Sequence, residues 1–182
     1  MRLSAYLLII SCALPAVSGA QQVCVGEFGE VICSKGVVDD INANGVAKIK
    51  GTEVEYHTQV NGSLRATNAK FASLTVNGDA TIKKSTVKAE AKINGSLNID
   101  DSQLLSNLIL TSNHAVFKKS QLKNIMIKKT NSPKQTIKLI ATTVKGDVSF
   151  ENESGIVYLC ENSKVEGKII GGKAITKCKK GV

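Results

Sequence analysis

Aromatic side chains, proline and histidine are all scarce in this sequence. It has no tryptophan, two prolines and two histidines, and aromatic residues make up 4% of the chain. The nucleophile-elbow, zinc-protease, P-loop and dinucleotide-binding motifs are absent from it. A carbohydrate-active β-helix enzyme would need an acidic groove with aromatic platforms, for which Tyr56 and Tyr158 are among the few candidates. We therefore predict no catalytic residue, no cofactor and no metal site, and we interpret His57 and His114 as isolated surface histidines.

Lysine carries the excess of positive charge, and the formal net charge is +9. The sequence has no arginine cluster that could fork onto bases or phosphates, so we expect no nucleic-acid partner. Lysines spread over polar surface positions favour attraction to an anionic surface polymer or polysaccharide. The alternative is that this charge only keeps a long β surface soluble.

Long apolar runs are also missing after residue 20, so no transmembrane anchor is expected in the mature chain. The first residues differ. Arg2 gives a positive start, Leu7–Val17 is mostly apolar, and Ser18–Ala20 resembles a cleavage site. This pattern predicts a signal peptide over residues 1–20 and a secreted or periplasmic location. A lipoprotein signal at Cys12 is the alternative, but it leaves almost no apolar region upstream.

A repeat of about 17 residues dominates the rest of the chain. Asn-Gly or an equivalent marks its position zero, at Gly45, Gly62, Gly78, Gly95 and Asn113. Apolar residues recur two and four residues before this position, and two, four and nine residues after it. These columns predict an inward-facing set: Val76, Ile82, Val87, Ile93, Ile99 and Leu104, then Ile109 and Thr111, and later Tyr158, Cys160, Ser163 and Val165. Such a short repeat, read in period-two couplets, predicts short strands stacked in coils.

Within one repeat, successive inward positions are separated by six, five and six residues. This spacing predicts three short strands per turn, one for each side of the coil. We therefore predict an all-β fold, a single-stranded right-handed parallel β-helix, or triangular β-solenoid, with seven or eight coils. Glycine is expected at one corner, where φ is positive. Serine hydroxyls should bond backbone groups at another corner, at Ser85, Ser102 and Ser120. Stacking should also place Asp100 between Lys83 and Lys118.

Four cysteines follow the signal peptide, namely Cys24, Cys33, Cys160 and Cys178. An even number in an exported chain indicates disulfides, and three pairings are possible. The segment between Cys24 and Cys33 can fold as a hairpin, while Cys160 and Cys178 lie about one coil apart, where stacked residues are ~4.8 Å from each other. We therefore favour the 24–33 and 160–178 pairs. A metal site is the alternative, but no cysteine or histidine spacing supports it.

The chain should divide into a signal peptide (1–20), an N-terminal disulfide-bonded cap (21–36) and a β-solenoid (37–182). Polar residues and a proline predict an insertion loop near 128–136. The cap should cover the first coil, and Lys177, Lys179 and Lys180 should make two copies of the last coil repel each other. We therefore expect a monomer or a weak dimer.

Several segments pair apolar residues around a glycine: Val144–Val148, Val165–Ile169, Val60–Leu64 and Ile93–Leu97. Over residues 37–175 this pattern resembles bactofilins, which implies a right-handed β-helix without catalysis and with end-to-end association. It also resembles exported adhesin-like β-solenoids, the relation that a signal peptide favours. We expect an exported, non-catalytic structural or interaction protein that binds a surface polymer or a protein partner. The alternatives are a self-assembling envelope filament of bactofilin type and a carbohydrate-active β-helix enzyme.

Overall fold

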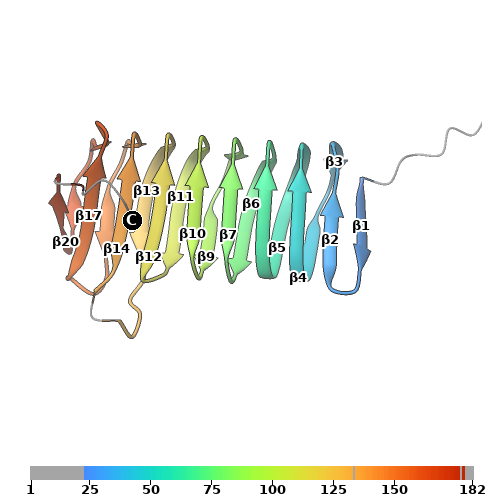
Figure 1. Ribbon diagram of the computed structural model, residues 1–182, viewed down its shortest axis with the longest axis horizontal. Coiled ribbons are helices and arrows are strands. Elements are labelled where there is room, and N and C mark those ends of the chain that lie inside the picture. The colour runs from blue at the N-terminus through green and yellow to red at the C-terminus, as the bar shows by residue number, and fades with distance from the viewer. Residues whose placement is uncertain (1–22, 133, 177, 179–182) are drawn as a thin grey trace, which may run out of the picture.

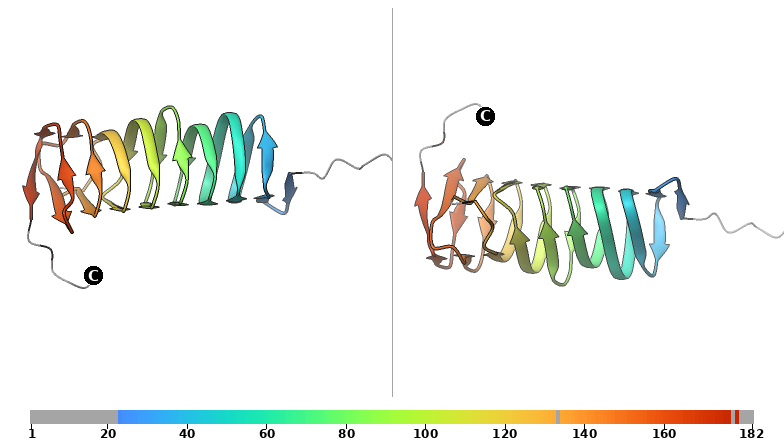
Figure 2. Two further views of the ribbon diagram at one scale, coloured as in Figure 1. Left: turned by 90° about the horizontal axis from the view of Figure 1, so that it is seen from above. Right: turned by 90° about the horizontal axis from the view of Figure 1, so that it is seen from below.

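The protein is a long parallel β-solenoid. The computed structural model describes residues 23–132, 134–176 and 178, and this part of the chain contains 20 strands and no helix. The strands form about nine turns of about 17 residues each. Figure 1 shows the resulting rod, with β1 at one end and β20 at the other, and Figure 2 shows the same rod from two further sides. The predicted fold class is confirmed, but the turns outnumber the seven or eight predicted. The predicted signal peptide lies outside the described residues.

Each turn contributes strands to three faces, and five long strands bend around corners to serve more than one face: β4 (Ile41–Lys50), β5 (Thr52–Thr67), β6 (Lys70–Asn77), β11 (Gln103–Thr111) and β13 (Gln121–Ile127). The first face consists of the C-terminal parts of β4 and β5 and of seven shorter strands. These strands are β2 (Glu30–Cys33), β7 (Ala80–Lys83), β10 (Leu97–Asp100), β12 (His114–Lys118), β14 (Thr136–Ile140), β17 (Gly155–Cys160) and β20 (Gly172–Ile175).

The second face takes the N-terminal parts of β5, β6, β11 and β13 together with β3 (Gly36–Val38), β8 (Thr86–Val87), β15 (Thr143–Val144) and β18 (Lys164–Val165). The third face takes the remaining parts of the long strands together with β9 (Ala91–Asn94), β16 (Val148–Phe150) and β19 (Ile169–Ile170). All of these pairings are parallel, so residues one turn apart stack in columns that run along the rod.

The core is built from the inward columns of the three faces. Alternate residues of each strand point inward, and the predicted inward residues Val76, Ile82, Val87, Ile93, Ile99 and Leu104 are 0% to 3% exposed. Because each inward side chain packs on the equivalent residue of the next turn, the local alternation of the sequence determines most of the buried residues.

One turn departs from the predicted register by one residue. Leu108 and Leu110 point inward and are buried, and the predicted Ile109 and Thr111 are their outward neighbours. The reason is one extra residue in the corner that follows. Thr111 and Ala115 are four positions apart, whereas the equivalent residues of the preceding turn, Asn94 and Leu97, are three positions apart. Asn113 consequently lacks the positive φ of the glycines with which the repeat aligns it.

A second departure lies near the C-terminal end. Val157 and Leu159, rather than the predicted Tyr158 and Cys160, continue the inward columns of the first face. The corner that follows holds two successive residues of positive φ, where the earlier turns have one. This extra residue returns Ser163 to its predicted column, where its hydroxyl accepts a hydrogen bond from a backbone N–H one turn earlier.

The glycine corner behaves as predicted over four turns. Its members have φ between 138° and 145°, and they are Gly45, Gly62, Gly78 and Gly95. A Cβ atom on any of them would lie less than 3.0 Å from the carbonyl oxygen of the glycine one turn earlier. Only glycine therefore lets successive turns stack at this corner.

A second corner, between the first and second faces, also requires positive φ but uses other residue types. Its φ values lie between 47° and 53°, at Asn68, Lys84, Asp101, Lys119 and Ala141. Their backbone N–H groups each donate to a carbonyl of the next turn. The repeat pattern does not predict this corner, because its side chains share no chemical type.

Serine hydroxyls complete the hydrogen bonding beside this corner, as predicted. The N–H of Ser85 donates to the Ser102 hydroxyl (3.1 Å), which in turn donates to the carbonyl of Asp100 (2.7 Å). The N–H of Ser102 donates in the same way to Ser120. These serines are only 3% exposed, so each hydroxyl satisfies backbone groups that water cannot reach.

Each end of the rod carries a disulfide. β1 (Cys24–Glu27) pairs with β2 in an antiparallel hairpin, and Cys24 and Cys33 are joined with their Cα atoms 4.0 Å apart. At the other end Cys160 is joined to Cys178, with a Cα separation of 5.6 Å. These are the two pairs that the spacing of the cysteines favours.

The hairpin reaches only one of the three faces. β2 also pairs in parallel with β4, so it is the first strand of the first face, and β1 covers its outer edge. β3 and the N-terminal part of β4 have no strand on their outer side within the described residues. The expected covering of the whole first coil is therefore limited to one face.

Candidate functional site

The charge of the protein is concentrated in one segment. Residues 102–146 contain eight lysines and no aspartate or glutamate, whereas the rest of the chain contains sixteen basic and fifteen acidic residues. Almost the whole formal net charge of +9 therefore belongs to this segment, which we name the basic belt. It spans β11 to β15, which form the yellow and orange part of the rod in Figure 1.

Most lysines of the basic belt have no anionic partner. Six ion pairs occur among the described residues, and Lys128, which contacts Glu151, is the only belt lysine in them. The predicted stacking of Asp100 between Lys83 and Lys118 is present in the register, but none of these six pairs includes Asp100. Seven of the eight belt lysines are therefore outside these ion pairs, and most of the positive charge of the belt is not neutralised by them.

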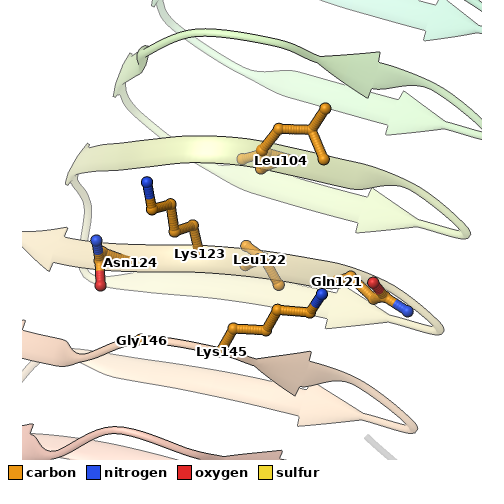
Figure 3. Close-up of a pocket in the computed structure, with 8 residues that line it drawn as sticks. Leu104, Gln121, Leu122, Lys123, Asn124, Lys145 and Gly146 are labelled. Atoms are coloured by element: carbon orange, nitrogen blue, oxygen red, sulfur yellow. The ribbon is translucent and has the colours of Figure 1, made fainter.

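A shallow groove lies on the second face within the basic belt. Its volume is about 330 Å³, and its lining comprises Leu104, Leu105, Gln121, Leu122, Lys123, Asn124, Lys145 and Gly146. In Figure 3 the Lys145 side chain extends toward Gln121, and the Lys123 side chain points toward the turn that contains Leu104. The groove combines two cations, two amides and an apolar floor.

The corner crossed by β13 at the groove is shorter than the equivalent corner of the preceding turn. Leu104 pairs with Leu122 and Leu108 pairs with Ile125, so β11 takes four steps between these inward positions and β13 takes three. Leu105 points outward because it follows the inward Leu104 in the strand. It is 53% exposed although it is a large apolar residue.

The polar side chains of the groove differ in the number of hydrogen bonds that they already make. Asn124 donates to the side-chain oxygen of Asn107 (2.9 Å) and accepts from the N–H of Asp147 (3.0 Å). The Gln121 side chain takes part in no hydrogen bond among the described residues, although it lines the groove. Gln121 and the two lysines are therefore the groups that can bind a ligand without breaking an existing contact.

Ion pairs lie on both sides of the groove along the rod, and on the N-terminal side the lysine next to the groove, Lys88, is paired with a more distant acid. Glu53 contacts Lys88 (2.9 Å) and Lys70 (3.4 Å), and the hydrogen bond from Lys88 and then the charge of Lys70 lower the pKa of Glu53. Toward the C-terminal end, Lys164 contacts Glu166 (2.6 Å). That hydrogen bond and the charge of Lys164, with a smaller effect of Lys145, lower the pKa of Glu166.

The two histidines lie apart, on different faces. His57 Nδ1 is 2.8 Å from the Ser73 hydroxyl, and His114 Nδ1 is 3.0 Å from the Thr136 hydroxyl. The Ser73 hydroxyl donates its only hydrogen to the carbonyl of Tyr56 (3.0 Å), so His57 must donate to Ser73. A histidine that acts as a general base must accept the hydroxyl hydrogen, so this arrangement does not make His57 a base for Ser73.

Metal-binding groups are also dispersed. Within the part of the chain that the structure describes, no three histidine, cysteine, aspartate or glutamate side chains gather as a metal site would require. The same residues include no helix with the length and apolar character needed to cross a membrane. Two disulfides are consistent with an oxidising, extracytoplasmic compartment.

Comparisons with models of protein families, with curated proteins and with solved structures find no match, and no family is identified for the chain.

The sequence does contain a signal for the basic belt, namely the long run without acidic residues. Catalytic motifs are defined by the order and spacing of particular residues, whereas this run is defined by charge alone. The groove needs more than this signal, since its lining residues come together through the stacking of turns that differ in length.

Proposed function

We propose that the protein is an exported, non-catalytic interaction protein that binds an anionic polysaccharide through the basic belt. The observation that carries this proposal is the segregation of charge: a 102–146 segment with eight lysines and no acid, in a chain that is otherwise nearly balanced. If the lysines served only solubility, they would not need to be gathered in one segment. A cluster of like charges on a rigid surface attracts a polyanion at long range.

The fold supports this proposal because it holds most of the belt lysines on a rigid framework. Every belt strand pairs with strands of the turns on either side, and five of the eight lysines lie on these strands or in the short corners directly after them: Lys118, Lys119, Lys123, Lys138 and Lys145. The other three lie in the loop between β13 and β14. A polymer can therefore bind several lysines at once, and each weak contact adds to the affinity of the next. The disulfides support the exported location, because such bonds persist in oxidising compartments.

Binding to immobilised polygalacturonate, a carboxylated polysaccharide, tests the proposal. We expect the disulfide-bonded protein to bind at low salt and to weaken as the ionic strength rises toward 0.15 M, where the screening length is about 8 Å. Replacing four belt lysines together by alanine (Lys118, Lys119, Lys123 and Lys145) should abolish most of the binding.

The matched control replaces four lysines outside the belt by alanine, at Lys48, Lys50, Lys70 and Lys92. It changes the net charge by the same amount, and we expect binding to persist. Equal loss in both variants would show that only the net charge matters, and absence of binding by the unaltered protein at low salt would refute the proposal.

Self-association through the ends of the rod is a second candidate function, of the bactofilin type. It is favoured by the strand edges that have no neighbour within the described residues, at β3 and β4 on one end and at β18, β19 and β20 on the other. Open edges recruit further strands. Sedimentation at increasing protein concentration tests this candidate, because growing polymers would support it and a constant monomer mass would contradict it. No observation in the described residues favours the carbohydrate-active enzyme, so it is not proposed.

A further inference from the structure

We infer that the groove holds a linear anionic sugar chain that lies parallel to the solenoid axis, with one sugar ring per turn over three turns. This inference rests on the proposed function and specifies the ligand and its orientation. The ligand chemistry is a chain of pyranose rings that carries a carboxylate or a sulfate group on each ring.

The register places three groove residues in one column. Leu104 pairs with Leu122, and Leu122 pairs with Val144. The residue that follows each of them points outward, so Leu105, Lys123 and Lys145 occupy successive turns. Strands in neighbouring turns are ~4.8 Å apart, which is close to the length that one pyranose ring adds to an extended chain. A chain along the axis can therefore place equivalent groups of successive rings over successive turns.

The chemistry of this column fits an anionic sugar better than it fits an anion without rings. Lys123 and Lys145 supply ammonium groups for carboxylate or sulfate oxygens, and no ion pair among the described residues occupies them. The exposed Leu105 offers an apolar surface for the C–H face of a ring. Gln121, in the neighbouring outward column, can exchange hydrogen bonds with ring hydroxyls. Polyphosphate could accept hydrogen bonds from the lysines and from the amide N–H groups, but it has no apolar face that would use Leu105.

The length of the site is limited by an engaged lysine at one border and by an acid at the other. One turn before Leu105, the column holds Lys88, which is already engaged by Glu53 at 2.9 Å. One turn after Lys145, the column holds Glu166, a carboxylate that would repel the ligand. The turns between these borders number three, so three rings are expected to fill the site.

Titration with oligogalacturonates of increasing length, and with sulfated oligosaccharides of the same lengths, tests this inference. Affinity should rise steeply up to three rings and then increase only slightly for longer chains. Lys123→Ala and Lys145→Ala should each weaken binding of the trimer roughly two- to five-fold, the range that one exposed ion pair supports. Leu105→Ser should weaken binding of sugars but leave binding of polyphosphate unchanged.

The matched control is Lys118→Ala with Lys119→Ala, which removes two lysines of the basic belt outside the groove. We expect this variant to bind the trimer nearly as well as the unaltered protein. If it loses as much affinity as the groove variants, or if affinity grows steadily with every added ring, the belt attracts polyanions without a defined site and the inference is wrong. That result would leave the proposed function standing, whereas failure of every polyanion to bind would refute both. A preference for the carboxylated or the sulfated series identifies the anionic group.

Discussion

Substitution of one corner glycine provides a sharp test of how the turns stack. Gly62 has a φ of 145°, and a Cβ atom at this position would lie less than 3.0 Å from the carbonyl oxygen of Gly45. The obstacle is backbone and not the end of a flexible side chain. Gly62→Ala must therefore either push two turns apart or change the corner, and both responses disturb hydrogen bonds along the rod.

Two contributions determine how much Gly62→Ala lowers the free energy of unfolding. An L-residue held in a glycine-only region of φ and ψ costs about 1–3 kcal/mol, and the steric overlap costs about another 1–3 kcal/mol. We expect Gly62→Ala to lower the free energy of unfolding by about 2–6 kcal/mol, a large part of the 5–15 kcal/mol typical of a domain. For a chain of this size the midpoint of thermal unfolding should fall by at least about 4 °C.

Thermal and urea unfolding followed by circular dichroism would measure this effect. Gly26→Ala is the matched control, because its Cβ atom would meet the nearest atom, in the Val31 side chain, at 3.8 Å, and its φ is not positive. We expect that control to change stability only slightly. If the two variants unfold alike, the glycine corner does not limit the stacking of turns.

Three further predictions concern the core, the disulfides and the surface charges. Leu104→Asp should lower stability by several kcal/mol or prevent folding, because it buries an unpaired charge between turns; an unchanged melting temperature would mean that the register is wrong. Non-reducing peptide mapping should recover the two disulfides within their own ends of the chain, and a peptide that joins the two ends would contradict the structure. Glu53 has a pKa below its ordinary value of 4.5, so its contribution to stability is present above pH 4.5 and is lost as the pH falls through its folded-state pKa. Glu53→Gln should therefore be less stable than the unaltered protein at neutral pH and equally stable in strong acid, as thermal unfolding across that range would reveal.

The sequence by itself determined the solenoid, its period and most of its core. Each inward residue packs mainly on its equivalents one turn away, so a local alternation repeated every 17 residues or so carries nearly all the information about burial. Ser85, Ser102 and Ser120 were equally predictable, because a hydroxyl stacked at a corner has backbone groups within reach in every turn.

Only the tertiary structure decided where the repeat gains a residue and which side chains come together. Two corners contain an extra residue, and for that reason Leu108 and Val157 point inward. An extra corner residue lengthens the turn but leaves the alternation of apolar and polar residues in the strands unchanged. The sequence pattern therefore cannot locate these extra residues. The groove depends on such lengths. Lys123 and Lys145 are 22 positions apart and still stack in adjacent turns, because the loop between β13 and β14 lengthens that turn on one side of the rod. Whether a lysine finds a carboxylate likewise depends on side-chain reach across turns, and for that reason stacking alone did not give Asp100 an ion pair.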